Sequence, residues 1–213
     1  MINILLIVSI ITVIIIGSKN FKADEFEATE LQVLEPKEKE EAIYKDVSKE
    51  HEKYDLVMWA TEKELIEPDE SGNFNPDEAM KEQDLAKIMV NYFPTIKEKL
   101  NITNEMSKEE KIDAYYHLLQ EENISLDGIE NENVRGEAVI KGIVAKTIMD
   151  LVSEEEIRYQ SHAIELLTTN EIWPEVENFI EATDESITKL EVVETFKKME
   201  EKGLVDVVNK TEE

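Results

Sequence analysis

The chain has 213 residues, of which 41% are hydrophobic and 34% are charged, with only six glycines and five prolines. This composition supports a packed core and favours helices over a many-turned β-sandwich. The formal net charge of −27 excludes the basic patch that nucleic-acid binding requires, and we interpret most acidic residues as a solvated surface. The absence of cysteine excludes disulfides, thiolate metal sites and cysteine nucleophiles.

An uninterrupted apolar run occupies residues 4–16 and ends at Gly17. It is shorter than the roughly 20 apolar residues that span a bilayer, and its length is typical of the hydrophobic part of a secretory signal peptide. We therefore predict that the protein is exported. Residues 1–23 are predicted to be a signal peptide, or a membrane anchor if the segment is retained.

Residues 24–43 are acidic, contain Pro36 and show no sustained apolar stripe. Such a composition predicts an exposed stalk. The stalk is the segment through which a partner protein could be held.

From Tyr44 onwards, the same order of helix, loop and helix returns three times. The apolar helices are expected at residues 55–66, 85–93, 112–119, 139–151, 164–167 and 192–199. The loops are expected at 67–76, at 124–133 and around Trp173, and Gly203 is a plausible cap of the last helix. A period of roughly 50 residues indicates a repeat architecture. Because one helix pair cannot bury its own apolar face, three pairs are predicted to share a core.

The start of the first copy resembles the S-layer homology repeat. That repeat begins with an aromatic residue, a polar residue and Asp-Val, and its first helix ends near a Gly-Leu-Ile-like triplet. A loop of the type Gly-Tyr-Pro-Asp-Gly-Thr-Phe-x-Pro follows. In this chain the three positions are occupied, in matching order and spacing, by Tyr44-Lys45-Asp46-Val47, Glu64-Leu65-Ile66 and Pro68-Asp69-Glu70-Ser71-Gly72-Asn73-Phe74-Asn75-Pro76.

The family's second helix begins with Ile-Thr-Arg-Ala-Glu, which the three copies resemble to different degrees. The second copy has Asn133-Val134-Arg135-Gly136-Glu137, and the third has Ile187-Thr188-Lys189-Leu190-Glu191. The first copy has Glu82 at the arginine position. The resemblance divides the chain into repeats at 44–94, 109–152 and 157–203, followed by an acidic tail at 204–213.

The resemblance implies an all-α fold in which three helix-loop-helix repeats surround a central three-helix bundle, with three prongs and pseudo-threefold symmetry. It also implies a non-catalytic, secreted protein of the Gram-positive cell wall that binds pyruvylated secondary cell wall polysaccharide in the grooves between repeats. The alternative is an exported helical protein-interaction module that keeps the fold but has lost sugar binding. That alternative rests on the loss of arginine at two of the three motif positions.

In the family, the motif arginine meets the carboxylate of the pyruvyl ketal, and in this chain the role falls on Arg135. A guanidinium offers a bidentate fork, and a helix N-terminus adds the positive end of its dipole. Lys189 is expected to be a second cation, whereas Glu82 predicts a silent groove at the first copy. The other candidate ligand-binding residues are Asp46, Gly72, Glu137, Thr188 and Glu191.

Several of these candidates also have purely structural interpretations. Asp46 is more readily a helix cap, and Glu137 and Glu191 are typical capping partners in a first helical turn. Arg135 could pair with a neighbouring carboxylate instead of a ligand. The large aromatic residues favour packing over sugar stacking; they are Trp59, Phe74, Trp173 and Phe179.

No motif predicts an enzyme, a cofactor or a bound metal. The loop at 69–75 places Phe74 where an EF-hand needs glycine. The three histidines are scattered and lack the His-Glu-x-x-His spacing. We therefore expect a non-catalytic protein whose main partner is the wall polysaccharide.

Overall fold

The computed structural model describes residues 43–124 and 126–208. The chain divides into two compact units, residues 1–39 and 40–213, and every described residue lies in the second unit. The predicted signal peptide at 1–23 and all but the last residue of the predicted stalk lie outside the described residues. Within the described part, no helix has both the length and the apolar composition needed to cross a membrane.

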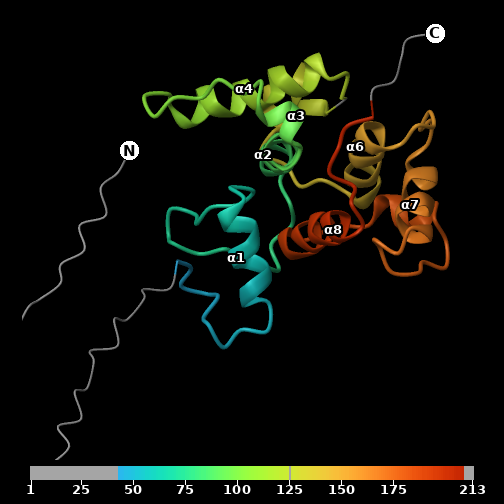
Figure 1. Cartoon of the computed structure of the whole chain (residues 1–213), viewed down its shortest axis with the longest axis horizontal. Coiled ribbons are helices and arrows are strands. Elements are labelled where there is room, and N and C mark those ends of the chain that lie inside the picture. Colours follow the sequence, from blue (N-terminus) through green and yellow to red (C-terminus); the bar gives the residue numbers. More distant parts are fainter. Residues whose placement is uncertain (1–42, 125, 209–213) are drawn as a thin grey trace, which may run out of the picture. The chain divides into compact units, whose positions relative to one another are not determined.

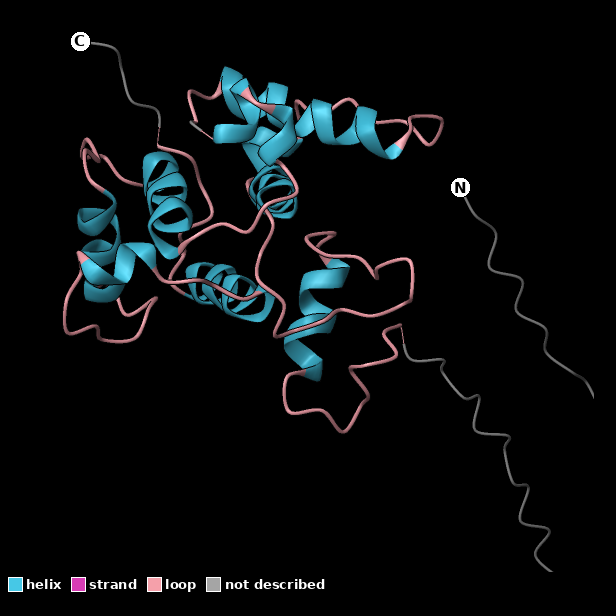
Figure 2. Cartoon of the chain, turned by 180° about the vertical axis from the view of Figure 1, so that it is seen from behind, coloured by secondary structure: helices cyan, strands magenta, loops and turns pink. Residues whose placement is uncertain are grey.

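Helices form the regular structure of the described residues, and loops connect them without any strand (Figures 1 and 2). The expected all-α class is therefore confirmed for this part of the chain. The elements are α1 (Tyr54–Glu62), α2 (Glu82–Tyr92), α3 (Pro94–Lys97), α4 (Lys108–Glu121), α5 (Asp127–Glu130), η1 (Glu132–Val134), α6 (Lys141–Val152), α7 (Gln160–Thr169), η2 (Glu181–Asp184) and α8 (Lys189–Glu201).

The segment expected to be a loop at 124–133 contains the short helix α5 and the start of η1. No apolar stripe marks a helix at this place in the sequence. A distant carboxylate stabilises it, because Glu82 accepts hydrogen bonds from the backbone amides of Asp127 (3.2 Å) and Gly128 (2.7 Å). These amides belong to the first turn of α5, where no intrahelical acceptor exists.

A closed ring of backbone contacts joins the segments that lead into α2, α6 and α8. Isolated β-bridges pair Ala79 with Thr188, Lys81 with Ala138, and Ile140 with Ser186. The first amide of each helix continues the pattern. The three hydrogen bonds run from Glu82 to the carbonyl of Glu137 (3.0 Å), from Lys141 to that of Glu185 (2.8 Å), and from Lys189 to that of Glu78 (2.9 Å). Each lead-in segment therefore contacts both of the others.

Helices α2, α6 and α8, whose lead-in segments form this ring, supply the centre of the core. The residues three positions after each helix start are fully buried; they are Leu85, Val144 and Val192. The residues seven positions after it are also fully buried; they are Met89, Ile148 and Phe196. Each of these helices also packs against another helix that belongs to a different copy. The contacts pair α1 with α8, α4 with α2, and α7 with α6. The copies are therefore interlocked rather than separate.

The described start of the expected acidic tail lies against the helices. The hydroxyl of Tyr92 donates to the carbonyl of Leu204 (3.1 Å), and the amide of Val208 donates to the carbonyl of Leu151 (2.8 Å). Leu204, Val205 and Val207 pack against the core. Residues 209–213 lie outside the described part.

The start of α8 offers a test of the fold, because Thr188 and Glu191 form a reciprocal capping box there. The hydroxyl of Thr188 accepts from the amide of Glu191 (3.2 Å), and the carboxylate of Glu191 accepts from the amide of Thr188 (2.8 Å). We expect Thr188→Ala to lower the free energy of unfolding by about 1 kcal/mol. Urea unfolding followed by circular dichroism measures this. Thr169→Ala, at an exposed position, is the control, and equal stability of the two variants would contradict the assignment.

Candidate anion-binding groove

The ring fixes which residues of the three copies correspond. Glu82, Lys141 and Lys189 each begin their helix and donate their amide to the next lead-in segment. Arg135 lies six residues before the start of α6. The expected placement of Arg135 at a helix start equivalent to that of Lys189 is therefore wrong, and Lys141 holds that place. The residues around Arg135 resemble the family's motif, but they do not occupy the start of α6. Only the backbone pairing between the lead-in segments shows which residue of the second copy corresponds to Lys189.

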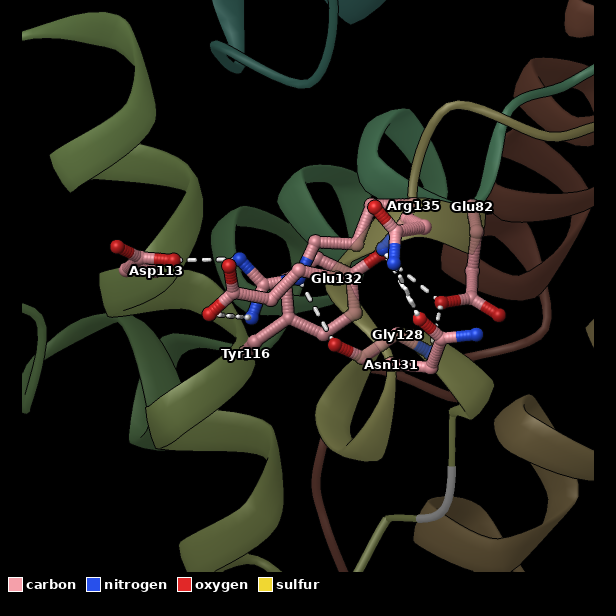
Figure 3. Close-up of polar contacts among 8 residues, drawn as sticks. Glu82, Asp113, Tyr116, Gly128, Asn131, Glu132 and Arg135 are labelled. Carbon is pink, nitrogen blue, oxygen red and sulfur yellow. Dashed lines mark hydrogen bonds and ion pairs between the residues drawn. The ribbon is translucent and has the colours of Figure 1, made fainter.

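Arg135 is engaged within the protein, with 13% of its side chain exposed (Figure 3). Its Nε donates to the carbonyl of Gly128 (2.8 Å), and its Nη1 pairs with Asp113. The guanidinium carbon lies 4.3 Å from the centre of the Tyr116 ring, in a cation–π contact. The structure therefore shows the purely structural alternative, in which Arg135 pairs with a neighbouring carboxylate.

Glu82 is 4% exposed, and Figure 3 shows its carboxylate beside the same cluster. Besides the two amides of α5, it accepts a hydrogen bond from the hydroxyl of Tyr116 (2.9 Å). Burial, and then the negative charge of Glu82, raise the pKa of Tyr116 far above its ordinary value, so this hydroxyl remains a donor. Three donors stabilise the buried charge that an unpaired carboxylate could not retain.

Asp46 and Gly72 shape a loop and do not line a cavity. The two carboxylate oxygens of Asp46 accept from the amides of Phe74 (2.8 Å) and Asn75 (2.7 Å). Asp46 does not cap α1, whose first residue follows Lys53 without a side-chain cap. Gly72 has a φ of +82°, a backbone conformation that favours glycine. Both residues therefore hold the loop at 67–76 in its conformation.

The other expected ligand residues are divided between capping and surface positions. Thr188 and Glu191 satisfy each other in the capping box, as the structural interpretation expects. Glu137 is exposed and lies before α6, where its carbonyl accepts from Glu82. Among the residues expected from the sequence, Lys189 alone lines the cavity beside α2, which we name the α2 groove.

The α2 groove has a volume of about 460 Å³, within the range of small-ligand sites. The loop at 67–75, the first half of α2 and the start of α8 surround it. Its lining comprises residues 65–69, 73–75, Glu78, Met80, Lys81, Gln83, Asp84, Lys87, Ile88, Lys108 and Lys189. Three parts of the chain that lie far apart in the sequence, within 65–88, at Lys108 and at Lys189, thus contribute to one cavity.

Four lysines face the α2 groove in a protein whose acidic residues outnumber its basic residues by 50 to 23. Glu78 pairs with Lys189 (2.5 Å) and Lys81 (3.5 Å), and Lys87 pairs with Glu67 (3.0 Å). Lys108 makes no ion pair among the described residues. The hydrogen bond from Lys189 holds the pKa of Glu78 below its ordinary value. In these pairs the glutamates are the more exposed partners of Lys189 and Lys87.

Asp84 is the half-buried acid of the α2 groove. Burial raises its pKa above the ordinary value, although the charges of Lys189, Lys81, Lys87 and Lys108 oppose this shift. The negative charge of Asp84 competes with an anionic ligand for these lysines. Its protonation state therefore influences what the groove can bind.

Two smaller cavities lie at the equivalent positions of α6 and α8, and both contain fewer lysines. The α6 groove, of about 220 Å³, contains Lys146, which pairs with Asp150 (2.6 Å). The α8 groove, of about 190 Å³, is lined mainly by apolar residues, together with Lys141, Lys198, Glu191 and Glu194. Lys141 reaches the α8 groove but pairs with Glu185 (2.6 Å).

The sequence contained part of the signal for the α2 groove. Lys81, Asp84 and Lys87 are spaced three residues apart, which places them on one side of a helix. Lys108 gives no such signal, because only the folding of the chain after α3 brings it to the cavity.

A comparison with protein families finds a match for the part of the chain that contains the loop at 67–76 and the start of α2. Residues 43–86 match the S-layer homology domain. The matched segment contains α1, the loop at 67–76, the first lead-in segment and the first turn of α2. S-layer homology domains are non-catalytic modules that bind the cell wall or cell surface, so the match assigns this general role. The curated proteins include no match to the chain.

A search of residues 43–124 and 126–208 finds no group of three His, Asp or Glu side chains placed to hold a metal ion.

Glu82 provides a test of the buried cluster. We expect Glu82→Ala to lower the free energy of unfolding by about 2–4 kcal/mol, because it leaves the Tyr116 hydroxyl and the amides of α5 unsatisfied. Thermal and urea unfolding measure the change.

Glu130→Ala serves as the control, since it removes an exposed acid from the same short helix α5. A Glu82→Ala protein as stable as this control would show that the hydrogen bonds of Glu82 contribute little.

Proposed function

We propose that the protein is a non-catalytic component of the Gram-positive cell envelope that attaches to pyruvylated secondary cell wall polysaccharide through the α2 groove. The convergence of Lys81, Lys87, Lys108 and Lys189 on one cavity carries this proposal. The family match supports the broader role in wall or surface binding.

The chemistry of the groove suits a sugar that carries a carboxylate. Lys189 begins a helix of 13 residues, so its ammonium group acts together with the positive end of the helix dipole. Ile66 and Pro68 provide apolar surface for the face of a sugar ring, and Asn73 and Asn75 provide polar groups for its hydroxyls. The ligand carboxylate takes the place of Glu78 beside Lys189.

We infer that the three copies are related by approximate threefold symmetry, since equivalent residues of each close the ring and fill the core. The three grooves have nevertheless diverged. We assign sugar binding to the α2 groove alone and assign Arg135 to packing, which replaces the expected role of Arg135 as the leading cation.

Export by residues 1–23 and a partner held by the stalk at 24–43 remain parts of this proposal. Both segments bear on how the protein reaches the wall and on what it presents there. If the groove binds no polysaccharide, the chain is an exported helical protein-interaction module.

Wall binding by the full chain tests the proposal. We expect Lys189→Ala to reduce the fraction bound to purified walls, with about a tenfold loss of affinity. Walls stripped of pyruvylated polymer are expected to retain neither the original protein nor the variant.

Lys141→Ala is the matched control, because it removes the lysine at the equivalent position, where Glu185 and the apolar α8 groove surround it. The proposal is wrong if Lys141→Ala and Lys189→Ala bind the walls equally, or if a folded original protein does not bind them.

The pH dependence of binding provides a second test. Because burial raises the pKa of Asp84, this group takes up a proton at a higher pH than an ordinary aspartate does, whereas the ketal carboxylate of the ligand lies in water and stays ionised. We expect affinity to increase several-fold as the pH falls through the raised pKa. Asp84→Asn should bind tightly and lose this dependence. An unchanged pH profile in Asp84→Asn would show that another group controls it.

A further inference from the structure

A second cavity adjoins the α2 groove and extends away from the ring. This α4 cavity has a volume of about 890 Å³ and lies between α2, the end of α1 and the chain from Lys97 to Tyr115. The two cavities share a wall that includes Pro68, Lys87 and Lys108. They therefore form one continuous depression rather than two separate sites.

The α4 cavity contains lysines that make no ion pair with the described residues. Lys87 and Lys97 pair with Glu67 (3.0 Å) and Glu64 (2.7 Å). Lys108 and Lys111, both in the first turn of α4, make no ion pair among the described residues. Altogether, six of the 23 basic residues of the chain line the two cavities. A single carboxylate in the α2 groove does not require the more distant lysines.

The other walls of the α4 cavity suit a carbohydrate. Asn91 and Tyr115 supply an amide and a phenol, while Leu100, Ile102 and Ile112 supply apolar surface. Sugar rings present hydroxyls at their edges and C–H groups on their faces, so they match a mixture of this kind. Most of the residues that line the α4 cavity lie outside residues 43–86, the part of the chain that matches the S-layer homology domain.

We propose that the α4 cavity binds a second negatively charged sugar unit of the same polymer at Lys108 and Lys111, so that the protein holds a polysaccharide segment with two anionic groups. The inference rests on the proposed function of the α2 groove. Lys108 lines both cavities and marks the passage between them. A polymer that runs from Lys189 to Lys111 therefore stays in contact with the protein throughout.

Titration calorimetry of the full chain with three pyruvylated probes tests this inference. The first probe is a single pyruvylated sugar. The second is an oligosaccharide with two pyruvylated sugars, and the third is an oligosaccharide of equal length with one. We expect the probe with two charges to bind about tenfold tighter than the probe of equal length with one.

Two single variants separate the cavities. Lys111→Ala, which lines only the α4 cavity, should abolish the advantage of the second charge and leave binding of the single sugar unchanged. Lys189 lines the α2 groove and not the α4 cavity, so Lys189→Ala should weaken the binding of all three probes. Lys202→Ala is the control for the loss of one exposed charge, since Lys202 pairs with Glu171 away from both cavities.

Equal affinity of the original protein for the two oligosaccharides would overturn the inference while leaving the proposed function intact, as would a full advantage of the second charge in Lys111→Ala. Failure of all three probes to bind would overturn both the inference and the proposed function.

Discussion

The backbone hydrogen bonds between the segments that precede α2, α6 and α8 are the constraint on which the rest of the described structure depends. Each segment is hydrogen-bonded to both of the others, so the three helix starts are held around one centre. Lys141 lines the α8 groove and Lys189 lines the α2 groove, whereas Glu82 is buried within the protein.

Glu82, Lys141 and Lys189, the first residues of α2, α6 and α8, lie in three different environments. Glu82 turns into the protein, where Tyr116 and the amides of α5 donate to its carboxylate. Lys141 pairs with Glu185 beside an apolar cavity. Lys189 lines the α2 groove together with three more lysines.

The negative net charge of the molecule limits how the lysines of the α2 groove can attract an anion. A net charge of −27 repels an anionic polymer at long range, so any attachment depends on short-range contacts. Three of the lysines of the α2 groove, Lys81, Lys87 and Lys189, pair with Glu78 or Glu67, whose side chains are substantially exposed. The acidic surface elsewhere disfavours non-specific adhesion to other anionic polymers.

The sequence by itself determined the helical class and the form of the first copy, because apolar spacing and turn residues act over short distances. Residues 44–76 could be compared position by position, and the capping pair of Thr188 and Glu191 follows from local spacing. The register of the second copy, the burial of Glu82 and the roles of Arg135 and Lys108 were decided only by tertiary structure. Each depends on hydrogen bonds or packing between residues far apart in the chain, and such contacts leave no local pattern in the sequence.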